Sequence, residues 1–83
     1  MNNIEKQIEI KTKLVKKLNA EVKEIESSRD QLAARYYGGE KHVYSALLCA
    51  VDNLDVARDR AILAFLDLNA AKRKAMEQGI EIQ

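Results

Sequence analysis

The stretch RYYGGEKHVY, residues 35–44, decides the fold, because its two adjacent glycines interrupt a long chain that contains no proline. Glycine adopts the left-handed backbone conformation that ends a helix and lets the chain reverse. Glu40 follows the pair, and a negative charge favours the first turn of a helix. The stretch therefore predicts a tight turn at residues 38–40, with Gly38 and Gly39 as the turn residues.

Upstream of this turn, apolar residues recur at alternating steps of three and four. This spacing is typical of a helix that packs along one narrow stripe. Lysine and glutamate, which favour helices, fill most positions between. We therefore predict a helix over about residues 3–37, with a seam toward the second arm that includes Ile8, Val15, Leu18, Val22, Ile25 and Leu32.

Downstream of the turn the same spacing predicts a second helix, over about residues 41–78, that ends at Gly79 and leaves a short tail at 79–83. Two arms of similar length around a tight turn predict an all-α fold. It is a single domain over residues 1–83, an antiparallel, coiled-coil-like hairpin about 50 Å long. The second arm supplies the seam residues Leu47, Val51, Leu54, Phe65 and Leu68.

The second arm carries more apolar residues than one seam can hold. Residues 61–66 are apolar all round the helix, whereas a hairpin covers only one face of each helix. Leaving large apolar side chains in water forgoes roughly 1.5 to 3 kcal/mol each. We therefore expect a partner, or self-association, to complete the fold by covering a surface formed by Leu48, Cys49, Val56, Ile62, Leu63 and Leu66.

Composition excludes several other classes of protein. The 14 basic and 13 acidic side chains nearly balance, which argues against a nucleic-acid partner. No apolar run is long enough for a membrane span. The single cysteine, Cys49, cannot form an internal disulfide, which favours a reducing compartment and predicts a cytoplasmic location.

No group of residues predicts an enzyme. His42 is the only histidine, and its neighbours Glu40 and Lys41 do not complete a nucleophile or metal set with it. Cys49 has no basic residue one helical turn away, so nothing activates its thiol. We therefore expect no cofactor, no metal and no small-molecule substrate.

The turn and the second arm resemble a known family, the small YscE-type needle-protein co-chaperones of bacterial type III secretion. The residues that carry this resemblance lie between about residues 12 and 70, and they are Gly38-Gly39-Glu40, Tyr44, Leu54, Ala57 and Asp67-Leu68. The resemblance implies a helical hairpin in the bacterial cytoplasm. It also implies two protein partners, a larger helical-repeat chaperone and the needle subunit that the two chaperones keep unpolymerised before export. Needle subunits are themselves hairpins of this length, but their turn contains proline and this chain has none.

An alternative interpretation needs no second protein. Two or more copies of the hairpin could form a helical bundle that acts as a small regulator or inhibitor through protein binding, for instance one made by a mobile element. A stable dimer or tetramer would favour this homo-oligomer, and a weakly associating chain would favour the co-chaperone.

Overall fold

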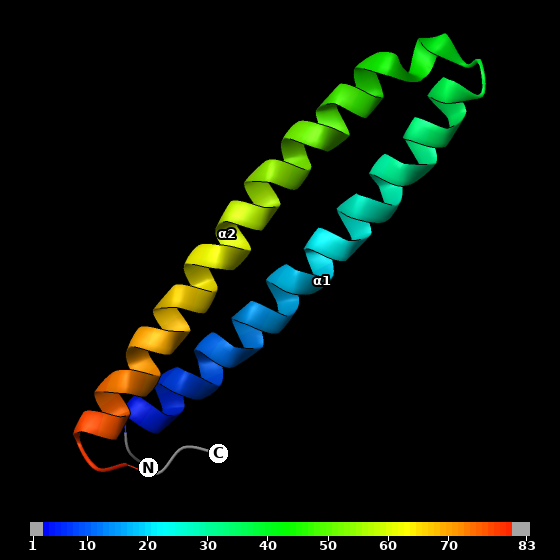
Figure 1. The fold of residues 1–83 in the computed structure, drawn as a ribbon. Helices are drawn as coiled ribbons and strands as arrows, with labels where there is room; N and C mark the ends of the chain where they lie inside the picture. The colour runs from blue at the N-terminus through cyan, green and yellow to red at the C-terminus, as the bar shows by residue number, and fades with distance from the viewer. Residues whose placement is uncertain (1–2, 81–83) are drawn as a thin grey trace.

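A computed structural model describes residues 3–80, which form a helical hairpin (Figure 1). Helix α1 spans Asn3–Tyr37, a single 3-10 turn, η1, spans Lys41–Val43, and helix α2 spans Tyr44–Glu77. The predicted all-α hairpin is therefore confirmed, and the first helix has the predicted bounds. The second helix, predicted over about residues 41–78, has a 3-10 first turn and ends one residue earlier, at Glu77. Met1 and the last three residues of the predicted tail lie outside the described residues.

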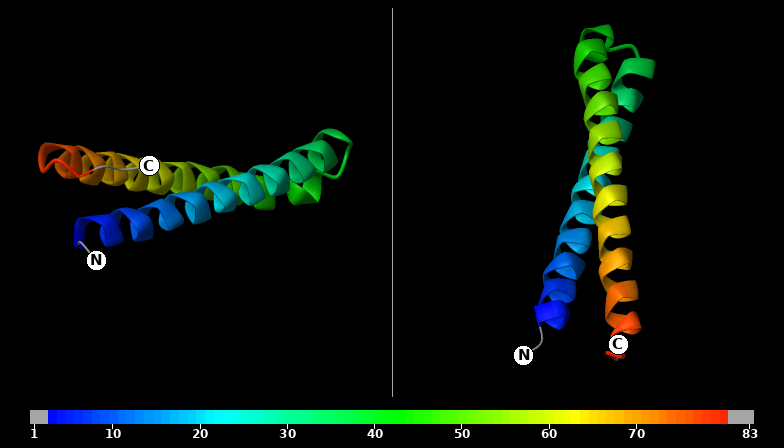
Figure 2. Two further views of the ribbon diagram at one scale, coloured as in Figure 1. Left: turned by 90° about the horizontal axis from the view of Figure 1, so that it is seen from below. Right: turned by 90° about the vertical axis from the view of Figure 1, so that its left-hand side faces the viewer.

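The hairpin is long and thin. α1 and α2 run antiparallel and side by side along its whole length, and they cross at a shallow angle (Figure 2). The described chain extends 59 Å along its axis and about 15 Å across it. Each helix therefore has one helical neighbour, and the opposite side of each helix faces solvent.

The turn closes α1 through a Schellman motif. Gly39 has a φ of +115°, and its N–H donates to the carbonyl of Tyr36 at 3.1 Å. The N–H of Glu40 donates to the carbonyl of Arg35 at 3.0 Å, so two carbonyl groups at the end of α1 have partners. Of the two predicted turn glycines, Gly39 is the one that needs the left-handed backbone. Gly38 lies where an added Cβ would come within 3.0 Å of the Ala34 carbonyl oxygen.

Side chains at the turn hold the two helices in place. Tyr36 stacks against Tyr44 of α2, with 5.3 Å between ring centroids, and the Lys41 ammonium lies 4.2 Å from the centre of the Tyr36 ring. The Glu40 carboxylate makes no capping hydrogen bond and pairs instead with the Arg35 guanidinium at 2.8 Å. Glu40 thus ties the turn back to α1 rather than capping the next helix.

The end of α2 repeats the glycine motif. Gly79 has a φ of +75° and donates to the Met76 carbonyl, while the N–H of Ile80 donates to the Ala75 carbonyl at 2.9 Å. This confirms that Gly79 ends the second helix. Ile80 then packs against a small core in which Ile8 meets Leu68 and Ala75, and this core closes the open end of the hairpin.

The predicted seam residues of α1 are all buried or partly buried. Ile8 and Leu18 are buried, and Val15, Val22, Ile25 and Leu32 are partly buried. On α2 the seam prediction holds for two buried leucines and a partly buried one, which are Leu54, Leu68 and Leu47 respectively.

The seam prediction is wrong for two residues of α2. Val51 is 38% exposed and Phe65 is 52% exposed, so both lie beside the seam and not in it. A seam through these positions would continue through Arg58 and Lys72, whose charges would then lie between the helices at a cost in desolvation. The hairpin instead uses the residues one position earlier, which are Ala50, Ala57, Ala64 and Ala71, all buried or partly buried. An alanine seam keeps charge out of the core and turns the larger apolar side chains outward.

Candidate protein-binding surface

The surface predicted to bind a partner is exposed on α2. Among its large side chains, Leu63 is the most exposed at 66%, and Leu48 the least at 47%. The thiol-bearing Cys49 is also exposed. We call these six residues the outer face of α2: Leu48, Cys49, Val56, Ile62, Leu63 and Leu66.

Phe65 enlarges the outer face beyond the prediction. With Ile62, Leu63 and Leu66 it makes four large apolar side chains within five residues, each more than half exposed. They surround Ala64, which is turned toward α1 and partly buried. The sequence did contain a signal that Phe65 is exposed. The alanines that stand one position before Val51, Arg58, Phe65 and Lys72 offer an alternative seam without charged residues. We call these four residues the central patch: Ile62, Leu63, Phe65 and Leu66.

α1 also exposes apolar side chains that the sequence reasoning missed. Ile10 is 57% exposed and Leu14 is 45% exposed, and both line a shallow groove between the helices near the open end. Lys11 and Asp67 form an ion pair across this groove. Ile10 and Leu14 lie outside the heptad series of α1. The sequence signals that could have indicated an apolar surface here were their large side chains and their spacing of four residues.

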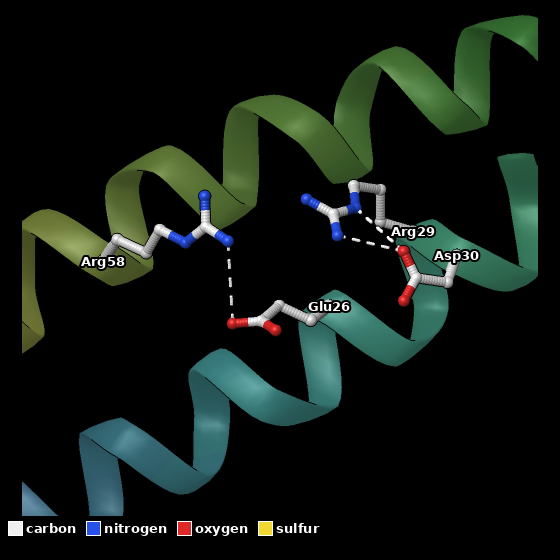
Figure 3. A network of polar contacts seen from close by, with 4 residues as sticks. All are labelled: Glu26, Arg29, Asp30 and Arg58. Carbon is white, nitrogen blue, oxygen red and sulfur yellow. Dashed lines mark hydrogen bonds and ion pairs between the residues drawn. The ribbon is translucent and has the colours of Figure 1, made fainter.

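One ion pair crosses the middle of the hairpin. The Arg58 guanidinium of α2 lies 3.7 Å from the Glu26 carboxylate of α1 (Figure 3). The Arg29 guanidinium donates instead to the carboxylate of its own neighbour Asp30 at 2.9 Å. Exposed pairs of this kind contribute little to stability, about 0 to 1 kcal/mol. The apolar seam therefore contributes most of the free energy that holds the two helices together.

Charged side chains of both signs lie on the exposed side of α2. Toward the turn lie three exposed carboxylates, those of Asp52, Asp55 and Asp59. Toward the open end lie the exposed cations Arg73 and Lys74. Within residues 3–80 none of these five side chains forms an ion pair. Exposed Arg58 and Arg60 lie among the carboxylates, and exposed Glu77 lies beside the cations, so the charges of α2 do not form separate acidic and basic flanks.

The remaining polar candidates are dispersed. His42 is exposed at the turn, with its Nε2 3.9 Å from the Glu40 carboxylate. In the part of the chain that the structure describes, no three His, Cys, Asp or Glu side chains gather into a group that could hold a metal ion. Over the same residues, neither helix is apolar enough along its length to span a membrane.

Searches for similar proteins returned nothing: no family model, no curated protein and no solved structure matches the chain. A functional assignment therefore rests on the exposed apolar surface of the hairpin. Apolar side chains of this kind gain free energy when a complementary surface removes them from water.

Proposed function

We propose that this hairpin is a protein-binding subunit that presents the outer face of α2 to another protein. One observation carries the proposal: large apolar side chains on α2 are about half exposed or more, while alanines fill the seam. Burying the exposed half of each would contribute about 1 kcal/mol per side chain. Five or six of them together supply much of the free energy that a specific complex needs.

The width of the apolar surface indicates the shape of the partner. On a helical wheel, Phe65 lies on one side of the central patch and Leu63 on the other, more than a third of a turn away. A single partner helix covers a narrower stripe than this. A concave surface built from two or more helices would cover the whole patch.

The resemblance at the turn and along the second arm extends the proposal to a role. In this proposal the chain is a co-chaperone in the bacterial cytoplasm that joins a larger helical chaperone. The pair keeps a type III secretion needle subunit soluble and unpolymerised before export. The chain contributes binding surface and no catalytic chemistry. The fold supports this role because a rigid hairpin displays an apolar helix face without hiding it.

Replacing Leu63 by Asp tests this function. We expect Leu63→Asp to abolish co-purification with the candidate chaperone and needle subunit co-expressed from the same genome, because the carboxylate would be buried without a partner charge. The far-ultraviolet circular dichroism of the variant should stay helical, since residue 63 is exposed in the hairpin.

A matched control is Leu14→Asp, which puts the same charge at an exposed leucine of α1 outside the outer face. This variant should still co-purify. The proposal fails if Leu63→Asp co-purifies like the unmodified chain, or if both variants lose the complex equally. Helix loss in Leu63→Asp with retained co-purification would likewise contradict it.

A further inference from the structure

A second stripe of residues at alternating steps of three and four runs along α2, beside the seam. It lies on the side of the hairpin where Arg58 reaches Glu26 of α1 (Figure 3). Five of its members are large apolar side chains, each between 38% and 56% exposed. We call this set the side stripe: Tyr44, Leu48, Val51, Asp55, Arg58, Ile62 and Phe65. The side stripe has the spacing of a helix seam, and within residues 3–80 its apolar members stay partly open to solvent.

The side stripe is complementary to itself when two copies of α2 run antiparallel. In one register Leu48 faces Phe65 of a second copy, and Val51 faces Ile62. These residues occupy the two alternating positions of a heptad seam, so they share one face of the helix and point toward the second copy. Apolar side chains therefore meet apolar side chains at four places along the contact.

Charge complementarity selects the same register. Asp55 of each copy faces Arg58 of the other, at the centre of the contact. Within residues 3–80 Asp55 forms no ion pair, and Arg58 has donors to spare beside its 3.7 Å contact with Glu26. A parallel copy would set Asp55 against Asp55, and a shift by one heptad would set it against Phe65 or Val51. Charged residues inside a seam fix orientation and register in this way.

Apolar burial decides between the two registers that pair opposite charges. A shift by two heptads sets Asp55 against Lys72 of the second copy. It also leaves Tyr44 and Leu48 beyond the last residue of the other α2 and covers only Met76 in exchange. The first register therefore covers five exposed apolar side chains per copy, whereas the shifted one covers four. A contact one helix wide is small, so the association is weak.

We propose that two copies of this hairpin associate weakly and antiparallel through their side stripes. The twofold axis crosses the contact between the two symmetry-related pairs of Asp55 and Arg58. Each Arg58 guanidinium then lies between Glu26 of its own chain and Asp55 of the second copy. Because both copies use the same surface, the association closes at two chains.

The dimer leaves part of the outer face free for another protein. Cys49, Val56 and Leu63 lie on the edge of α2 that is turned away from the side stripe, so the second copy does not cover them. The inference concerns the chain on its own and does not rest on the co-chaperone role. The dimer and the proposed function can therefore fail separately.

Cysteine cross-linking tests the register. In a Cys49→Ser background, Val51→Cys with Ile62→Cys places two thiols opposite one another across the dimer. At about 100 µM chain we expect this variant to form intermolecular disulfides rapidly under mild oxidation. The matched control is Val51→Cys with Leu63→Cys. Residue 63 is more exposed than residue 62 but is turned away from the contact, so the control should form such disulfides much more slowly.

Light scattering with charge exchange tests the pairing itself. The apparent mass of the unmodified chain should rise from that of a monomer at about 1 µM to that of a dimer at a few hundred µM. Asp55→Arg or Arg58→Asp alone should weaken the dimer about tenfold, because each turns two attractive pairs into repulsive ones. The two substitutions together should recover most of the association. Arg60→Asp makes the same charge change outside the side stripe, so it should leave the association unchanged.

Four outcomes would overturn the proposal: a chain that stays monomeric at a few hundred µM, an assembly larger than a dimer, equal cross-linking of the two cysteine variants, or a charge exchange no better than the single reversals.

Discussion

Leu54→Ala is expected to lower the free energy of unfolding by about 2 to 3 kcal/mol, near the low end of the cost of removing a buried leucine. Leu54 is 2% exposed and is the largest side chain of the described residues that is fully buried. In a hairpin about 15 Å across, the space left by the leucine lies close to the surface, where neighbouring side chains and water can fill it, so the cost stays near the low end. Because small domains have only a few kcal/mol to lose, a substantial fraction of the variant should be unfolded at 25 °C.

The measurement is thermal and urea unfolding followed by far-ultraviolet circular dichroism at one fixed protein concentration. Leu14→Ala is the matched control, because it removes the same atoms from a leucine that is 45% exposed and lies outside the outer face. Leu14→Ala should lower the free energy of unfolding by less than half as much as Leu54→Ala does. Equal losses for the two variants would show that Leu54 is not the central seam residue.

Ala57→Leu is expected to destabilise the hairpin by about 1 to 3 kcal/mol, although leucine is nearly as good a helix former as alanine. Ala57 is 8% exposed and belongs to the alanine series on the α1 side of α2. Three additional carbon atoms at this position would push the helices apart or force side chains out of their preferred rotamers.

Ala46→Leu provides the control for this second prediction, because residue 46 is exposed and has room for a larger side chain. Its unfolding midpoint should change little. If Ala57→Leu were as stable as Ala46→Leu, the alanine seam would be wrong and the seam through Val51 and Phe65 would have to be reconsidered.

The sequence alone predicted the hairpin because its strongest signals are local. A proline-free chain with one pair of central glycines leaves few alternatives to two long helices, and Gly39 and Gly79 both adopt the positive φ that their positions suggested. The seam of α1 was equally clear, since its large apolar residues other than Ile10, Leu14 and Tyr37 form a single series.

The seam of α2 could not be assigned from spacing, because α2 offers two series that share Leu47, Leu54 and Leu68. The choice between them is a tertiary effect. One series would place Arg58 and Lys72 at the centre of the contact between the helices, and the other places four alanines there, two of them buried and two partly buried. Packing against α1 favours the series without charges at its centre, although Phe65 is then left exposed. This same choice enlarges the exposed surface by one aromatic side chain, that of Phe65.

The most direct test of the account is the accessibility of residue 63 in the assembled protein. In a Cys49→Ser background, the thiol of Leu63→Cys should react with a maleimide slowly when the chain is bound to its candidate partner, and rapidly when it is alone. A thiol at the exposed position 27 of α1, introduced as Ser27→Cys, should react rapidly in every case. Equal, rapid labelling of both thiols under all of these conditions would contradict the claim that the outer face of α2 is the binding surface.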